Sequence, residues 1–139
     1  MPLCAPLSAS LTKLEFCDND DMEHFTKEQE QALQILTSLQ ELKISFCHKL
    51  QGMPAGLSRL PNLKRLEISC CEAIRLWPKD GLPSSLTELV ITSCPAIRSL
   101  PKGSLPSSLQ TLDVHDGDNN EELKRQCHKL RGTIPIIRA

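Results

Sequence analysis

The chain has 139 residues, enough for one domain, and its 40% hydrophobic content can form a core although only 3% of residues are aromatic. Its 16 basic and 17 acidic residues give a formal charge of −1, so no long-range field attracts nucleic acid or an anionic membrane. No apolar run approaches the roughly 18 residues that cross a bilayer, and residues 1–6 lack the basic and apolar regions of a signal peptide. We therefore expect a cytoplasmic location, with the nucleus as the alternative, and neither nucleic acid nor membrane as a partner.

A leucine frame recurs along the chain. The pattern Leu-x-x-Leu-x-(Ile/Val/Phe)-x-x-(Cys/Asn/Gly) starts at residues 11, 39, 63, 86 and 109, so successive starts from the second onward are 23 or 24 residues apart. This is the period of leucine-rich repeats. It predicts an α/β solenoid: a leucine-rich-repeat arc with a parallel concave β-sheet, a mostly irregular convex side, one inserted short helix and a C-terminal capping helix.

Three segments follow from this frame. Residues 1–10 are predicted to be an irregular N-terminal segment from a truncated upstream repeat, so we expect the chain to be the tail of a longer solenoid. Residues 11–117 hold about five leucine-rich repeats. Residues 118–139 form the C-terminal cap, because a solenoid needs its exposed end covered.

The first repeat, residues 11–38, is longer than the others and carries an insertion. Residues 26–29, Thr-Lys-Glu-Gln, have the form of a capping box, and Leu33 and Leu36 lie on one face of a helix. The pattern predicts a short helix that packs as an insertion on the convex side.

Each repeat begins with a predicted strand. From the third to the seventh position of the frame, polar and apolar residues alternate, as in a strand with one buried face. In the second repeat, Leu42 and Ile44 point inward and Glu41, Lys43 and Ser45 point outward. We expect the chain to turn at the ninth position, where Asn or Cys can bond to the backbone; these residues are Asn19, Cys47, Cys71, Cys94 and finally Gly117.

The return segments between strands contain proline, which cannot donate to a β-ladder and fixes its own φ. Pro54, Pro78 and Pro101 follow an apolar residue at corresponding positions of three repeats. We therefore expect extended chain and short turns on the convex side. Residues 119–132 differ: they begin with Asn, carry acidic residues in the first turn and basic residues in the last, and end in Gly, which predicts the capping helix.

The outward strand positions form the candidate protein-binding surface. Charge alternates between neighbouring repeats at the third and fifth positions, so the side chains form either ion pairs within a solvated sheet or a polar docking face. The last repeat offers an acidic end at Asp113, Asp116 and Asp118, suited to a basic partner segment. The candidate site residues are Lys13, Glu15, Glu41, Lys43, Arg65, Glu67, Glu88, Val90, Thr92, Thr111, Asp113 and His115.

No motif for catalysis, cofactor binding or metal binding is found in the sequence. There is no Gly-rich phosphate loop, no pair of histidines on a helix and no nucleophile elbow. Three of the seven cysteines are spaced by the repeat period and not by the short Cys-x-x-Cys spacing that zinc requires. Cys127 and His128 are neighbours on a helix and point about 100° apart, so they do not form a nucleophile–base pair. We predict a binding module without enzymatic activity.

Residues 39–54 read Leu-x-x-Leu-x-Ile-x-x-Cys-x-x-Leu-x-x-Met-Pro, and the frame returns at Leu63 and Leu86 after Pro-Asn-Leu and Pro-Ser-Ser-Leu connections. Near the end, Leu-Lys-Arg-Gln-Cys at 123–127 precedes Gly-Thr-Ile-Pro-Ile at 132–136. These motifs resemble the C-terminal leucine-rich-repeat region of plant, particularly cereal, intracellular nucleotide-binding disease-resistance receptors. The chain departs from that pattern at Gly117 and in a tail without the usual tryptophan.

The resemblance implies a role in plant innate immunity. In that family the repeats contribute to recognition of a pathogen effector or a host guard protein, and they hold an upstream nucleotide-binding domain of the same receptor inactive. Two alternatives remain open. A substrate-recruiting arm of a ubiquitin ligase also has Cys-containing repeats, with a helix after the Cys, and an extracellular leucine-rich-repeat receptor or inhibitor would repeat a Gly-x-Ile-Pro motif that occurs here once.

Overall fold

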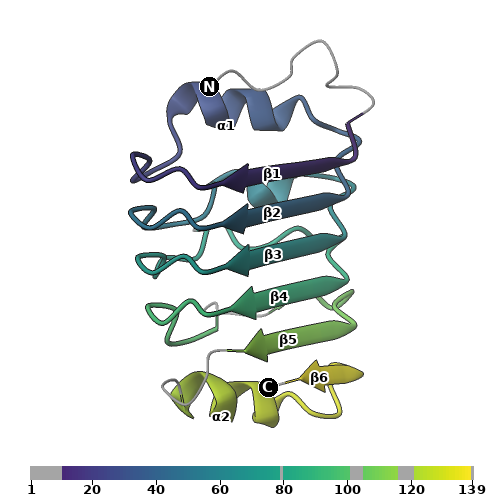
Figure 1. Ribbon diagram of the computed structural model, residues 1–139. Helices are drawn as coiled ribbons and strands as arrows, with labels where there is room; N and C mark the ends of the chain where they lie inside the picture. Colours follow the sequence, from purple (N-terminus) through teal and green to yellow (C-terminus); the bar gives the residue numbers. More distant parts are fainter. Residues whose placement is uncertain (1–10, 79, 101–104, 116–120, 139) are drawn as a thin grey trace.

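Strands in a single parallel sheet form the framework of the protein. The computed structural model describes residues 11–78, 80–100, 105–115 and 121–138. Its six strands follow one another in chain order, each parallel to the next (Figure 1). They are β1 (Lys13–Cys17), β2 (Glu41–Ser45), β3 (Arg65–Ser69), β4 (Glu88–Thr92), β5 (Thr111–His115) and β6 (Ile136–Arg138). The first five strands occupy the third to seventh positions of the leucine frame, which confirms that prediction. The sheet is open, and the arrangement is consistent with an α/β repeat-like arc.

In Figure 1, α1 (Lys27–Gln34) is seen at the β1 end of this stack and α2 (Glu121–Lys129) at the β6 end. The predicted capping box of α1 is present: the Thr26 hydroxyl accepts from the Gln29 N–H at 3.1 Å, and the Gln29 side chain accepts from the Thr26 N–H at 2.8 Å. A 3₁₀ turn, η2 (Leu57–Arg59), interrupts the second return segment. No helix in the described part of the chain is long and apolar enough to cross a membrane.

The core runs as one cluster behind all the strands. The inward side chains of the second to fifth strands are almost wholly excluded from solvent, including Leu42, Leu66, Leu89 and Leu112 at 0% exposure. Each such leucine contributes about 1.5–3 kcal/mol through burial. The leucines of the frame therefore form the stabilising core, and the opposite face of the sheet is available for other contacts.

The chain turns one position earlier than we expected. The eighth residue of each of the first four repeats, and not the ninth, has a left-handed backbone, with φ between 53° and 56°. The backbone N–H of each of these residues still donates to the next strand, as Phe46 N–H does to the Ser69 carbonyl at 3.1 Å. We call these residues, Asp18, Phe46, Cys70 and Ser93, the turn row.

The cysteines at the ninth position have the hydrogen-bonding role that was predicted for them. The Cys47, Cys71 and Cys94 thiols are buried, and each donates to a carbonyl of the preceding repeat, at 3.8, 3.7 and 3.6 Å respectively. Asn19, in the same position of the first repeat, uses its side chain locally and accepts from the Asp21 N–H at 3.2 Å. Gly117 lies outside the described residues.

Strand β6 was not predicted from the sequence, which indicated only a capping helix in this region. Ile136–Arg138 pair with Thr111–Asp113 and extend the sheet beyond the fifth repeat. Helix α2 confirms the predicted C-terminal helix, and its Leu123 and Cys127 side chains are fully buried. The C-terminal cap thus consists of a helix and a strand together.

Candidate functional site

Strand register brings all twelve candidate residues onto one side of the sheet, which we call the open face. The third positions align as Lys13, Glu41, Arg65, Glu88 and Thr111. The fifth positions align as Glu15, Lys43, Glu67, Val90 and Asp113. Thr92 and His115 are partners in the seventh column. Residues up to about 100 positions apart in sequence therefore share one surface.

Arg65 is the centre of the charge pattern on the open face. Its guanidinium lies 2.6 Å from Glu67, 3.3 Å from Glu88 and 3.6 Å from Glu41. Partial burial lowers the pKa of Arg65, but the hydrogen bond with Glu67 and the three carboxylates outweigh this effect and raise the pKa above its usual value. The predicted ion pairing between neighbouring repeats is confirmed around this residue.

In the described part of the chain, fewer ion pairs join the outward side chains of β1 and β2 than those of β2, β3 and β4. Lys43 lies 3.7 Å from Glu67 on β3, while Glu15 on β1 accepts a hydrogen bond from the Ser45 hydroxyl at 3.2 Å. Within the described residues, no ion pair joins Lys13 to Glu41 or Glu15 to Lys43, although strand register aligns both pairs. Ser45 points outward as predicted but is only 2% exposed.

Val90 offers less surface than we expected for a docking residue. It lies on the open face between Glu67 and Asp113 in the fifth column, yet only 7% of it is exposed. The accessible part of the open face is therefore mainly polar.

Asp113 is flanked by two basic side chains. His115 Nε2 lies 2.6 Å from one carboxylate oxygen, and Arg138 on β6 approaches the other at 3.9 Å. Arg138 therefore partly offsets the negative charge of the predicted acidic end at Asp113. Arg138 was missed because its strand is too short to show a period in the sequence, and Asp116 and Asp118 lie outside the described residues.

Phe46 in the turn row was also missed as a surface residue. It is 44% exposed, and its ring contacts only the edge of the His48 ring among aromatic groups of the described chain, with centroids 6.4 Å apart. A left-handed conformation costs an ordinary L-residue about 1–2 kcal/mol, and Asn, Asp and Gly adopt it most readily. The large aromatic side chain at this position is therefore not explained by the turn or by core packing.

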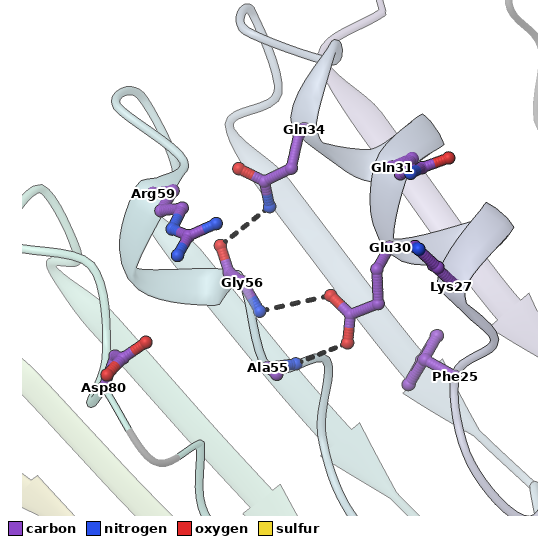
Figure 2. A pocket seen from close by; sticks show the side chains of 9 residues that line it. All are labelled: Phe25, Lys27, Glu30, Gln31, Gln34, Ala55, Gly56, Arg59 and Asp80. Atoms are coloured by element: carbon purple, nitrogen blue, oxygen red, sulfur yellow. Dashed lines mark hydrogen bonds between the residues drawn. The ribbon is translucent and has the colours of Figure 1, made fainter.

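A shallow cavity of about 330 Å³ lies on the return side, between α1 and η2 (Figure 2). The Glu30 carboxylate accepts from the Ala55 and Gly56 N–H groups at 2.6 and 3.1 Å, and the Gln34 amide donates to the Gly56 carbonyl at 3.0 Å. Figure 2 shows both side chains reaching from α1 across to the second return segment. These polar groups satisfy one another and join two repeats, which indicates a structural role for this cavity.

The described residues do not group metal-binding side chains, and they separate the Cys127 and His128 side chains. No group of three or more His, Cys, Asp or Glu residues in this part of the chain is placed to hold a metal ion. Cys127 is fully buried whereas His128 is exposed, so the two side chains point apart. Burial raises the pKa of Cys127 to about 11, which disfavours the reactive thiolate.

Comparison of this chain with protein-family models, with curated proteins and with solved structures gives no match in any of the three. Function is therefore inferred from the chain's own residues and geometry.

Proposed function

We propose that this chain is a leucine-rich-repeat solenoid that binds proteins as part of a plant innate-immune receptor. In this role it contributes to effector recognition and to autoinhibition of an upstream nucleotide-binding switch domain. The observation that carries the proposal is the open face, where five strands of equal length present outward side chains in continuous register. The motifs of residues 39–54 and 123–136, which resemble that receptor family, supply the biological context.

The charge pattern on the open face suits a polar protein partner. Partly exposed ion pairs such as Lys43–Glu67 contribute only about 0.2–1 kcal/mol each, so a partner with complementary charges can replace them at low cost. Five strands about 4.8 Å apart, with five residues of about 3.3 Å each, present on the order of 400 Å². A stable interface buries about 800 Å² per partner, so binding must extend beyond the open face.

Two kinds of partner follow from the proposal. One is a pathogen effector or a host guard protein, and the other is the nucleotide-binding domain of the same receptor. For autoinhibition, the repeats must bind the resting form of that domain more tightly than its active form, because only differential affinity shifts an equilibrium. No catalytic step or cofactor on this chain is required.

The return segments favour this proposal over a ubiquitin-ligase arm. Ligase repeats of that kind place a helix after the ninth-position Cys. The segment after Cys47 contains only the three-residue turn η2, and the described residues after Cys71 and Cys94 contain no helix before the next strand.

The test begins with the transcript that encodes this chain. We expect a nucleotide-binding domain in the same reading frame upstream. That domain, expressed separately, should bind the chain about tenfold more tightly in its ADP form than in its ATP form, measured by isothermal titration calorimetry. Arg65→Glu should weaken this binding, because it replaces the central cation of the open face with an anion.

Arg59→Glu is the matched control, since it makes the same change of charge at an exposed position in η2, on the return side and away from the open face. Absence of an encoded nucleotide-binding domain, or equal affinity for its two forms, would remove the receptor proposal. Equal weakening by Arg65→Glu and Arg59→Glu would show that binding depends on overall charge and not on the open face.

A further inference from the structure

Phe46 stands out among the exposed side chains because neither folding nor packing explains it. The turn row requires a left-handed backbone in each of four repeats, whichever residue is present. Asp18, at the corresponding position of the first repeat, is a residue type that adopts this conformation readily. Phe46 leaves 44% of its surface in water, so only part of this large apolar side chain is stabilised by burial.

The surroundings of Phe46 hold it in a defined position. Its backbone N–H donates to the Ser69 carbonyl at 3.1 Å, and the Ser45 carbonyl beside it accepts from the Asp18 N–H at 3.1 Å. The His48 ring contacts the Phe46 ring edge to face, and Glu72 of the next repeat lies 3.7 Å from His48. Hydrogen bonds to the repeats on both sides therefore hold the backbone at Phe46, and the His48 ring restricts the Phe46 side chain, which lowers the entropic cost of binding.

The charge around Phe46 differs from that on the open face. The turns after β1, β2 and β3, residues 18–24, 46–50 and 70–72, contain five carboxylates and a single lysine. Within the described residues, no ion pair engages Asp18, Asp20 or Asp21, which are all exposed. On the open face, in contrast, Arg65 and Lys43 satisfy the carboxylates beside them.

We propose that Phe46 is the anchor of a docking site for a basic segment of a partner protein, with an arginine or lysine over its ring and the nearby carboxylates around it. A cation is attracted to the face of an aromatic ring, and arginine makes this contact most often. The Asp18 and Glu72 carboxylates, in the turns of the preceding and following repeats, add charge complementarity to a basic segment. Aromatic residues are also the side chains most often found at the energetic centre of protein interfaces.

This inference depends on the proposed protein-binding function but not on the identity of the receptor. The site lies beside the open face, at the carboxyl ends of the strands, and so adds contact area to a surface that is too small alone. The proposed ligand of the Phe46 site is an exposed, positively charged peptide segment.

The test uses the full chain and three synthetic nonapeptides that differ only in carrying three arginines, three glutamates or three leucines. In a ¹H–¹⁵N NMR titration we expect the arginine peptide to shift the signals of Phe46, His48 and Glu72 more than those of the open face. Phe46→Asn should weaken its binding about fivefold or more. Asn tolerates the left-handed turn, so the melting temperature of this variant should stay the same or rise by about 3 °C.

Leu76→Asn is the matched control, because Leu76 is an exposed apolar residue of the return side, at 52% exposure, and its loss should leave peptide binding unchanged. Three results would overturn the proposal: no binding of the arginine peptide, equal or tighter binding of the glutamate or leucine peptide, or unchanged affinity in a folded Phe46→Asn variant. None of these three results depends on the affinity for the nucleotide-binding domain, so the failure of one proposal can be told apart from the failure of the other.

Discussion

The two ends of the sheet differ in how well they cover the core. At the β5 end, strand β6 and helix α2 lie against the last repeat, and Leu112 and Val114 are at most 1% exposed. At the β1 end, the corresponding Leu14 is only partly buried, and so is Leu11 at the start of the frame. Within the described residues, β5 pairs with a strand on each side whereas β1 pairs with β2 alone, and the same sequence position is more exposed at β1. Burial of a frame leucine depends on having a neighbour on each side, which is the physical basis of repeat stacking.

The largest expected effect is on the free energy of unfolding, when Leu112 and Leu14 are each replaced by alanine. Leu112→Ala should lower the free energy of unfolding by about 3 kcal/mol, because it removes a fully buried side chain and leaves a cavity. Leu14→Ala should cost roughly half as much, since part of that side chain already contacts water. Urea denaturation followed by circular dichroism measures both. Equal losses would mean that the β1 end is covered as completely as the β5 end.

A pH-dependent effect is expected from the covered end. Burial raises the pKa of Cys127 to about 11 from an ordinary value of 9.0, so the folded state holds this proton more tightly than the unfolded state. The resulting contribution to stability is complete below pH 9 and is lost as pH rises through 11, on the order of 2 kcal/mol.

The measurement is the difference in unfolding free energy between the natural chain and Cys127→Ala at each pH. This difference should be constant from pH 7 to 8.5 and decline between pH 9 and 11. Subtraction cancels the titration of all groups that the two proteins share. A difference independent of pH would show that the thiol is as well solvated in the folded state as in the unfolded one.

The smallest effect concerns the charges of the open face, which pair in the middle of the sheet and not at its β1 edge. Arg65→Gln should lower the free energy of unfolding by about 1 kcal/mol at low ionic strength. The loss should be smaller at about 0.5 M salt, because salt screens partly exposed ion pairs. Lys13→Gln is the matched control, because Lys13 forms no ion pair with Glu41 in the described structure. It should change the free energy of unfolding by only about a few tenths of a kcal/mol at either salt concentration. Similar salt dependence for both variants would contradict the pairing seen in the structure.

Much of the candidate site could be predicted because the repeat period and the strand alternation act together. Leucines at the first and fourth positions fix the inward face, and the period of two then assigns Glu41, Lys43 and Arg65 to the opposite face. Parallel pairing in register places equal positions of successive repeats side by side. Val90 lies on the outward side as the alternation predicts, yet it is only 7% exposed, because direction alone does not determine exposure.

Local signals also determined the helices. The Thr26 capping box and the charge gradient of residues 119–132 act through contacts three or four residues apart, which a sequence displays directly. The Glu30 contacts to Ala55 and Gly56 had no such signal, because they join residues 25 and 26 positions apart through the packing of two return segments.

The sequence by itself therefore determined the strands, their two faces, the buried leucines and both helices, since each depends on a period or on neighbours close in the chain. The tertiary structure decided the left-handed turn row, strand β6, the approach of Arg138 to Asp113 and the exposure of Phe46. Each of these depends on which backbone groups and side chains an adjacent repeat supplies. A three-residue strand such as β6 has no detectable period, and it forms because the free edge of β5 offers hydrogen bonds that it can complete.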